Sequence, residues 1–479
     1  MGQFHPPPPS PEAKYPRECL ETGQSLTGWW IRLGRQGRER LIEAMDNGKE
    51  MAPEAGEAAG MSPAEPQTFQ DLGLPSLFLS HLTLKHCFYM DFFTLGDLTE
   101  RLKVSASIIS EVLEYLKKSK WVEVRGPDPM HLMVSSLSLA NRHSLTDAGR
   151  KQAALLIEYD SYAGPAPVVL KDYWRQVARQ SIGKVGIRPD RIHRVLEGLV
   201  LSAEVPEQLG VAAVSGKPLF LYGPPGNGKT AICQRFSRVW EDDILVPYAL
   251  FVDGQVIQVY DEITHAPSEA AASEGERMDR RWVRCRRPVV MVGGELTLDM
   301  LDLAYKPTLK YFEAPLQLKA NNGVFIVDDF GRQQISPQEL LNRWIIPLET
   351  RQDFLRLRTG QKFAVPFDQF IIFATNLEPR TLVDEAFLRR LRSKVKVDYV
   401  NREQFVEIFH LCCDQYHLEF DPEAVEYLLS RYYDGSRPLT ACHPRDLLEQ
   451  ILDYCRFYQL APRLTPENLD RACHNYFVA

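Results

Sequence analysis

A glycine-rich turn between an apolar strand and an apolar helix start carries the most specific chemistry in the sequence. The segment is LFLYGPPGNGKTAI, at residues 219–232. Its spacing fits the pattern Gly-x-x-x-x-Gly-Lys-Ser/Thr, in which backbone N–H groups and the positive end of a helix dipole surround phosphate oxygens. We therefore expect a bound nucleotide to lie on this turn and to contact Gly223, Pro224, Pro225, Gly226, Asn227, Gly228, Lys229 and Thr230.

Single residues of this turn have separate expected tasks. Gly226 and Gly228 let the backbone aim its N–H groups inward, because glycine tolerates conformations that other residues avoid. Lys229 is expected to reach the β- and γ-phosphates, and the Thr230 hydroxyl to ligate Mg²⁺. The predicted cofactors are therefore ATP and Mg²⁺. The alternative is a Gly/Pro turn that holds no ligand.

Two adjacent aspartates follow a second apolar strand, in the stretch GVFIVDD at residues 323–329. Parallel sheets place their ligands at the carboxyl ends of strands. We expect Asp328 to hold the Mg²⁺ shell through water and Asp329 to polarise the attacking water. ATPases with these two motifs often carry Glu at the second position, and Asp is one methylene shorter, so hydrolysis could be slow. The alternative for Asp329, an N-cap for a helix beginning near Ser336, lies too far along the chain.

With both motifs placed, the sequence resembles the AAA+ ATPases, and within them the MoxR-like group, over roughly residues 190–479. The MoxR-like resemblance rests on YFEAPLQLKANNG and on the succession of Leu-Glu, hairpin, Pro, strand and Asn over residues 347–376. It implies a P-loop α/β fold, with a parallel sheet, helices on both faces and a C-terminal α-helical lid. The group usually carries Asp-Glu where this chain has Asp-Asp, which bears on the rate of hydrolysis and not on nucleotide binding.

The resemblance also implies further site residues. FIIFATN looks like the strand that carries sensor 1, so Asn376 would bond the γ-phosphate or the attacking water. DEAFLRRLR is similar to the arginine-finger segment, so Arg389 or Arg390 would reach the ATP of a neighbouring subunit. CHPRDLLEQI resembles the sensor-2 helix, so Arg445 would touch the γ-phosphate from the lid. The alternatives are an Asn376 that only caps a turn, surface charges at Arg389 and Arg390, and an Arg445 paired with Asp446 or Glu449.

The overall composition limits the class of protein. The net charge of −7 and the pI of about 6.0 exclude a general polyanion binder, although a local basic patch is allowed. Nine cysteines without CxxC or Cys/His spacing favour free thiols in a reducing compartment over disulfides or a zinc site. No apolar run approaches about 18 residues, and the N-terminus lacks the layout of a signal peptide. We expect a soluble cytoplasmic protein without membrane insertion.

The N-terminal third divides into a tail and a small domain. Residues 1–70 are rich in Pro, Ala, Glu and Gly and are expected to be mostly disordered, apart from one amphipathic helix over 26–45 that docks on the chain or binds a partner. Residues 71–160 predict helix, turn, helix and a small hairpin, and look like a winged helix-turn-helix. This domain has ten Lys or Arg against eleven Asp or Glu, and its expected recognition helix carries Glu111 and Glu114. DNA binding is therefore possible in principle, but protein docking is favoured.

The rest of the chain is predicted to form a linker at 161–189, an AAA+ core at 190–400 and a helical lid at 401–479. Four helices are expected in the lid, with Asp421 and Thr465 as N-caps before proline. An insertion between residues 265 and 289, within the stretch that separates the two motifs, carries six arginines from position 277 to 287, preceded by several acids. A ring interface, a contact with a polyanion and a solvated hairpin neutralised by its own acids are the alternatives for this run.

Three hypotheses of function follow. The first is an enzyme that hydrolyses ATP at subunit interfaces of a homo-oligomeric ring, expected to be a hexamer, and remodels a protein partner in a chaperone-like way. The second is an ATP-dependent DNA-binding regulator or loader with the winged helix as reader. The third is a nucleotide-gated scaffold that binds ATP and barely hydrolyses it.

Overall fold

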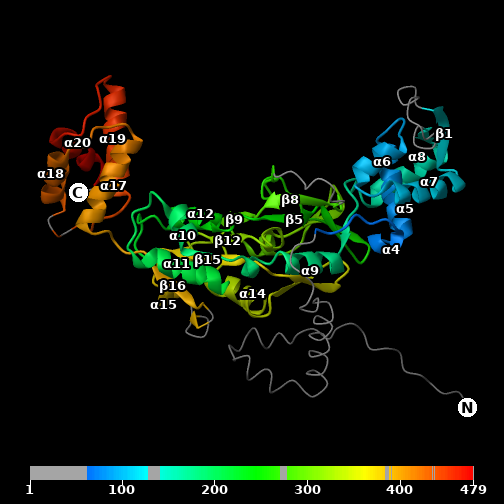
Figure 1. Cartoon of the computed structure of the whole chain (residues 1–479), viewed down its shortest axis with the longest axis horizontal. Coiled ribbons are helices and arrows are strands. Elements are labelled where there is room, and N and C mark those ends of the chain that lie inside the picture. Colours follow the sequence, from blue (N-terminus) through cyan, green and yellow to red (C-terminus); the bar gives the residue numbers. More distant parts are fainter. Residues whose placement is uncertain are drawn as a thin grey trace, which may run out of the picture. The chain divides into compact units, whose positions relative to one another are not determined.

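The computed structural model describes residues 62–127, 141–269, 278–382, 388–389, 391–433, 435 and 437–477. All of them belong to the second of the chain's two units, Gly56–Ala479. They form two five-stranded sheets, three two-stranded antiparallel pairs and the helices labelled in Figure 1. The predicted disordered tail and the helix over 26–45 lie outside the described residues, apart from 62–70.

One of the two larger sheets is entirely parallel. Its order is β16–β4–β15–β12–β9. The carboxyl ends of β4, β15 and β12 therefore lie side by side at one edge, followed by the glycine-rich turn, Asn376 and the Asp328–Asp329 pair respectively. The strands are β4 (Leu219–Tyr222), β9 (Val289–Val292), β12 (Val324–Val327), β15 (Phe370–Thr375) and β16 (Ser393–Lys396).

Helices cover both faces of this sheet, because alternate strand residues point to opposite sides. Leu219 and Leu221 share one core with residues of α10 (Pro189–Leu196), α11 (Glu204–Ser215) and α12 (Lys229–Phe236). On the other face, Phe325 and Phe373 pack on Trp344 of α14 (Pro337–Thr350), with ring centroids 5.2 and 6.2 Å apart. This arrangement confirms the predicted α/β sheet with helices on both faces.

A second sheet of mixed direction is built from strands on either side of the predicted insertion. Its order is β10–β11–β7–β6–β3, with parallel pairs only at β11–β7 and β6–β3. Helix α9 contributes Tyr173 and Val177 to the core beneath it, so part of the segment 161–189 is helical and buried. The elements are β3 (Val168–Val169), α9 (Leu170–Arg179), β6 (Ala249–Val252), β7 (Gln255–Gln258), β10 (Ala304–Lys306) and β11 (Tyr311–Glu313).

Arginines of the insertion hold it to its surroundings. The buried Arg281 pairs with Asp279 at 2.7 Å and also donates to the Pro167 carbonyl. Arg287 pairs with Asp242 at 2.6 Å. Asp279 thus neutralises Arg281 within the run, whereas Arg287 pairs with an acid outside it, and both arginines are buried, unlike those of a solvated hairpin. Arg277 lies outside the described residues. The strand pairs here and downstream are β5 (Asp243–Pro247) with β8 (Trp282–Arg286), and β13 (Gln352–Arg356) with β14 (Lys362–Pro366).

The predicted helices and strand pair of the N-terminal domain are present. Ile108, Val112 and Leu116 are buried at helical spacing on α7, and the Thr146 hydroxyl caps α8 by accepting from the Gly149 N–H at 3.0 Å. The core of this domain continues onto the mixed sheet, which adds Ala249 and others to it. The elements are α4 (Phe69–Leu72), α5 (Ser76–Phe88), α6 (Leu95–Leu102), α7 (Ala106–Lys118), β1 (Val122–Pro127), β2 (Asn141–Leu145) and α8 (Asp147–Tyr159).

Four helices close the chain, as predicted, and they share their own apolar core. The expected N-caps are formed: Asp421 accepts from the N–H groups of Glu423 and Ala424, and Thr465 accepts from that of Asn468. The helices are α17 (Arg402–Gln415), α18 (Pro422–Tyr432), α19 (His443–Phe457) and α20 (Pro466–Tyr476). Short helical turns occur elsewhere at η1 (Ile182–Lys184), η2 (Ser237–Val239), η3 (Leu298–Leu301), α13 (Leu316–Lys319) and α15 (Pro379–Leu382).

The sequence led to predictions about the state of the cysteines and about membrane-spanning segments. Within the described residues all eight cysteines are free thiols, and most are buried. None of the helices in the described ranges combines the length and the apolar character that crossing a bilayer requires.

Candidate functional site

The glycine-rich turn depends on its glycines for conformation and for space. Gly226 and Gly228 have φ of 76° and 80°, a region that other residues rarely adopt. Gly228 is also the N-cap of α12, so the turn leads directly into a helix N-terminus. A Cβ atom on Gly226 would lie 2.7 Å from both Cys442 Sγ and Thr440 Cγ2, which belong to the segment before α19. The turn is therefore shaped by its own backbone and by the C-terminal helices.

The lysine of the turn is buried against it. Lys229 Nζ donates to the carbonyl oxygens of Gly223 at 2.9 Å and Pro224 at 2.8 Å, and only 7% of the residue is exposed. Burial lowers the pKa of this ammonium, and the nearby carboxylates of Asp328 and Asp329 oppose that effect. A cation held among carbonyl oxygens at the end of a strand can exchange these weak partners for phosphate oxygens.

Two hydrogen bonds join the predicted polar residues across neighbouring strands. Thr230 Oγ1 donates to Asp328 Oδ2 at 2.7 Å, although the two residues are 98 positions apart in the sequence. Asn376 Nδ2 donates to Asp329 Oδ1 at 3.2 Å. The parallel strand order explains both contacts, because β12 and β4 flank β15.

The oxygen atoms of Thr230 and Asp328 are of the type that Mg²⁺ prefers. Two protein ligands suffice for this ion, because Mg²⁺ usually keeps several waters and binds substrate phosphates as well. Within the described ranges, no group of three or more His, Cys, Asp and Glu side chains is placed to hold a metal by itself. The chemistry of the pair thus fits an ion that arrives with a phosphate ligand.

These residues line a cavity of about 560 Å³. The cavity brings together nine of the predicted site residues: Gly226, Asn227, Gly228, Lys229, Thr230, Asp328, Asp329, Asn376 and Arg445. Gly223, Pro224 and Pro225 do not line it, and the first two contribute their carbonyl oxygens to Lys229 instead. Arg389 is exposed and does not line it, and Arg390 lies outside the described residues.

The cavity also has an apolar side that the sequence analysis missed. Part of it is the short run Leu199, Val200 and Leu201 after α10, and part is Ile408 and Leu411 on α17. The signal for the first was an apolar run between two helices, too short for a periodic pattern. The sequence pattern does not single out Ile408 and Leu411, because α17 also carries apolar residues, including Phe405 and Phe409, that pack into the core of the C-terminal helices.

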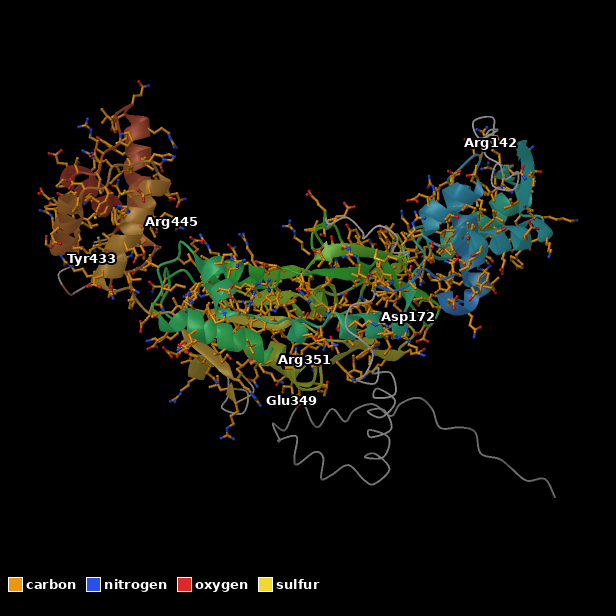
Figure 2. The ribbon with its side chains drawn as sticks, in the orientation of Figure 1. Arg142, Asp172, Glu349, Arg351, Tyr433 and Arg445 are labelled. Atoms are coloured by element: carbon orange, nitrogen blue, oxygen red, sulfur yellow. The ribbon has the colours of Figure 1, made fainter. Side chains whose placement is uncertain are left out.

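The surroundings of Arg445 have features of both its predicted roles, which are contact with the γ-phosphate and pairing with Asp446 or Glu449. It lines the cavity, yet its guanidinium donates to Asp446 Oδ1 at 2.8 Å and lies 3.9 Å from Glu449. The hydrogen bond with Asp446 is the main reason that the Arg445 pKa is raised. Figure 2 labels Arg445 on the first turn of α19. The pairing predicted as the alternative is therefore present, at the wall of the same cavity.

Backbone and amide contacts connect the C-terminal helices to the turn. The Cys442 N–H donates to the Gly226 carbonyl at 2.9 Å, and the Ala441 N–H donates to Asn227 Oδ1 at 3.1 Å. Asn227 is 3% exposed and also bonds to Pro224. The segment before α19 thus contacts the turn directly. A conformational change in one therefore alters the hydrogen bonds of the other.

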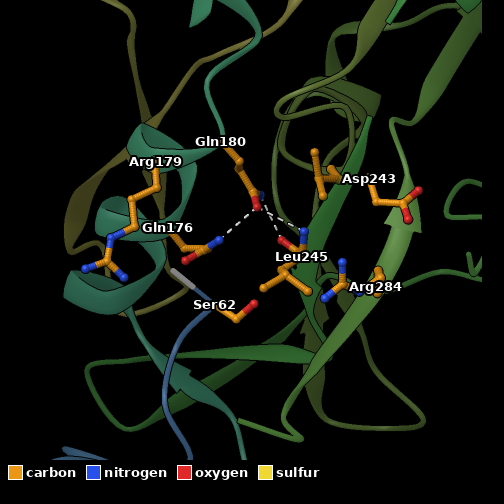
Figure 3. Close-up of a pocket in the computed structure, with 8 residues that line it drawn as sticks. Ser62, Gln176, Arg179, Gln180, Asp243, Leu245 and Arg284 are labelled. Atoms are coloured by element: carbon orange, nitrogen blue, oxygen red, sulfur yellow. Dashed lines mark hydrogen bonds between the residues drawn. The ribbon is translucent and has the colours of Figure 1, made fainter. Parts of the chain in front are cut away.

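A smaller cavity of about 150 Å³ lies beside α9 and β5 and is shown in Figure 3. Gln176 Nε2 donates to Gln180 Oε1 at 3.0 Å, and Gln180 makes two hydrogen bonds of 2.9 Å with the backbone of Leu245. These amides tie a helix to a strand, so this cavity belongs to a structural joint.

Comparison with known proteins gives one family match and distant structural likenesses. The family described as "Domain of unknown function (DUF8689)" matches residues 401–475, the four C-terminal helices. No curated protein matches the sequence. NtrX from Brucella abortus in complex with ADP is similar with a TM-score of 0.36 and 15% identity, over 67% of this chain and 65% of that chain.

Two further structures show likeness of the same low degree. The Thermotoga maritima RuvB Holliday junction branch migration motor has a TM-score of 0.33 and 13% identity, over 57% of this chain and 69% of that one. Domain III of the Thermotoga maritima replication initiation protein DnaA has a TM-score of 0.34 and 14% identity, over 62% and 100%. The chain spans only 59% and 65% of the lengths of the two NtrX structures.

Proposed function

We propose that the protein is an ATPase of the AAA+ type, of the MoxR-like kind, that binds ATP with Mg²⁺ in the 560 Å³ cavity. The observation that carries the proposal is the pair of hydrogen bonds Thr230–Asp328 and Asp329–Asn376 at the wall that also contains Lys229. A lysine, a hydroxyl and two carboxylates around one glycine-rich turn match the needs of a metal-bound triphosphate.

The two sides of the cavity bind different parts of ATP. The phosphates lie on the turn, with Lys229 turning from the carbonyls of Gly223 and Pro224 to the β- and γ-phosphates. Thr230 would ligate Mg²⁺ and Asp328 would hold its water shell, and the ion would neutralise charge on the phosphates. The apolar side, with Leu199 and Leu411 among its residues, takes the base because its surface is apolar and flat groups bury well there.

The chemical step uses the acid and the amide after β12 and β15. Asn376 holds the attacking water and Asp329 accepts its proton as the oxygen bonds to the γ-phosphorus. The bond from that phosphorus to the bridging oxygen breaks, and the electrons leave with ADP. Arg445 exchanges Asp446 for the γ-phosphate, and Arg389 or Arg390 of a neighbouring copy supplies further positive charge in a homo-oligomeric ring, for which we propose a hexamer.

The output of hydrolysis is proposed to act on a protein partner in a chaperone-like way. Domain 401–479 serves as a lid, whose contacts with Gly226 and Asn227 connect it to the nucleotide. The N-terminal domain, proposed to be a winged helix, meets the partner. On its helix α7, Lys117 pairs with Glu114 at 3.0 Å, which reduces the free positive charge available for a DNA backbone. This pairing favours a protein over DNA, and a cytoplasmic location is proposed with it.

The test is phosphate release under steady-state conditions, together with ATP binding, for the wild type and Asp329→Asn. We expect Asp329→Asn to keep ATP affinity within about twofold and to lose most of its turnover, about 100-fold or more, because the amide cannot accept the proton. Asp253→Asn is a matched control, since Asp253 is also exposed with φ of 47° but lies in the β6–β7 turn. Undiminished turnover in Asp329→Asn would show that another group is the general base. A wild type that binds ATP without turnover would favour a nucleotide-gated scaffold.

A further inference from the structure

One side-chain amide, that of Gln333, contacts three backbone groups in the loop after β12. Gln333 Nε2 donates to the carbonyl oxygens of Asp328 at 2.8 Å and Asp329 at 3.0 Å. Its Oε1 accepts from the Gly331 N–H at 2.8 Å. Two carbonyl partners and one N–H partner fix the orientation of the amide, because only one end of the group can donate. A single residue therefore satisfies three backbone groups around the acid pair.

The backbone that Gln333 holds is unusual at Asp329. Its φ of 50° lies in the left-handed region, which costs free energy for residues other than glycine. A change of φ re-aims the Cα–Cβ bond, so this conformation decides where the short Asp329 side chain points. It points so that Asn376 Nδ2 donates to Asp329 Oδ1. Strain of this kind persists only where surrounding contacts impose it.

Other contacts fix the neighbouring residue but leave the Asp329 carbonyl to Gln333 and one backbone group. The Phe330 N–H donates to the Ala374 carbonyl at 2.7 Å, and Thr375 Oγ1 donates to the Phe330 carbonyl at 2.7 Å. The Asp329 carbonyl itself also accepts from the Arg332 N–H at 3.0 Å. The strand β15 thus anchors Phe330, whereas the Gln333 amide joins the two backbone carbonyls on either side of the Asp329 Cα to the Gly331 N–H.

We propose that Gln333 is a positioning residue for hydrolysis: it holds Asp329 in the left-handed conformation from which its carboxylate meets Asn376. Gln333 does not line the cavity, so it acts through Asp329 and not on the nucleotide. This inference rests on the proposed ATPase function and deepens it, because it names what compensates for an acid that is one methylene shorter than glutamate.

The experiment measures kcat, KM and ATP affinity for Gln333→Ala and for Gln333→Met, which keeps the volume of the side chain without its hydrogen bonds. We expect kcat to fall about tenfold or more in both variants, since small misplacement of a catalytic group is costly, with ATP affinity changed less than about twofold. Gln333→Glu, which keeps only the acceptor for the Gly331 N–H, is expected to behave like Gln333→Met. Gln334→Ala is the matched control, because the adjacent Gln334 is exposed.

A second background separates positioning from a general structural role. In Asp329→Ala, adding Gln333→Met should lower the single-turnover rate less than about twofold, because the group that Gln333 positions is already gone. An equal loss in both backgrounds, or a Gln333→Met kcat equal to that of Gln334→Ala, overturns the inference while the ATPase function stands. A wild type without any ATP hydrolysis overturns the proposed function and the inference together. If Gln333→Ala does not fold, Gln333→Met decides the outcome.

Discussion

The polar side chains of the cavity differ in how much their present hydrogen bonds must change before they can contact a ligand. Thr230 already donates a hydrogen bond to Asp328 at 2.7 Å, so the hydroxyl and the carboxylate that would hold the ion lie together. Lys229 still bonds to carbonyls of its own turn, and Arg445 still bonds to Asp446. The proposed nucleotide would therefore require Lys229 and Arg445 to exchange their partners, with little movement of Thr230 and Asp328.

Thr230→Val tests the metal ligand. The valine keeps the shape of the side chain and removes the hydroxyl, so we expect the Mg²⁺ concentration for half-maximal hydrolysis to rise about tenfold, with activity partly recovered at high Mg²⁺. The measurement is phosphate release as a function of Mg²⁺ at saturating ATP. An unchanged Mg²⁺ requirement would contradict a role for Thr230 as a ligand.

Sequence patterns predicted most of these groups but not their conformations. The glycine-rich turn, the Asp pair and Asn376 each follow an apolar strand, and strand order then brings them together. The left-handed Asp329 and the Gln333 contacts could not be predicted, because they depend on how the loop is fixed between β12 and β15. Local residue patterns do not contain that information.

Connections between secondary-structure elements were harder to predict than the elements themselves. The four C-terminal helices and their Asp421 and Thr465 caps follow from local signals. The contacts of the segment before α19 with Gly226 and Asn227 do not, because they join positions more than 200 residues apart. The mixed sheet was likewise missed, since its strands are short and come from both sides of the glycine-rich turn.

Gly226→Ala tests the contact between the segment before α19 and the turn, with Gly254→Ala as control. The two glycines have φ of 76° and 79°, so both substitutions carry a left-handed penalty of about 1 kcal/mol. A Cβ on Gly226 meets Cys442 and Thr440, whereas one on Gly254 meets nothing within 4 Å. We expect both variants to lose thermal stability and only Gly226→Ala to lose ATP affinity, measured by calorimetry. Equal ATP affinity in the two variants would show that this contact does not matter for binding.

His86 on helix α5 leads to a prediction about how the stability of the fold depends on pH. Burial lowers the pKa of His86 from 6.5 to about 4, with Arg101 and Lys85 adding to the effect and the bond to the Gly164 carbonyl opposing it. Between these values the unfolded chain binds a proton that the folded chain does not, so stability falls as pH falls from 6.5 towards 4. The full effect is roughly 3 kcal/mol.

His86→Gln removes this titration while keeping a side-chain amide that can donate to Gly164. We expect the wild type to lose more thermal stability than His86→Gln when the pH is lowered from 7 to 5. The nearby His81, whose pKa burial also lowers, remains in both proteins and contributes equally. The same pH dependence in the two proteins would contradict the assignment to His86.

Within the described residues, the cavity proposed to bind a nucleotide is connected to the domains that precede and follow it in sequence. The N-terminal domain shares a core with the mixed sheet, and the C-terminal helices contact the glycine-rich turn. Both attachments are by buried or hydrogen-bonded groups, so movement at the cavity has physical routes to each. Everything proposed for this assembly, including the ring and the protein partner, depends on ATP occupying the cavity.

Equilibrium binding of ATP with Mg²⁺, measured by titration calorimetry on the wild type, Lys229→Ala and Lys217→Ala, tests this most directly. Lys217 is the matched control, because it precedes the opposite end of strand β4. We expect wild type and Lys217→Ala to bind ATP alike and Lys229→Ala to bind about 100-fold more weakly or not at all, since a charge-assisted contact to the phosphates is lost. ATP affinity unchanged by Lys229→Ala, or no binding by the wild type, would contradict the assignment of the cavity to a nucleotide.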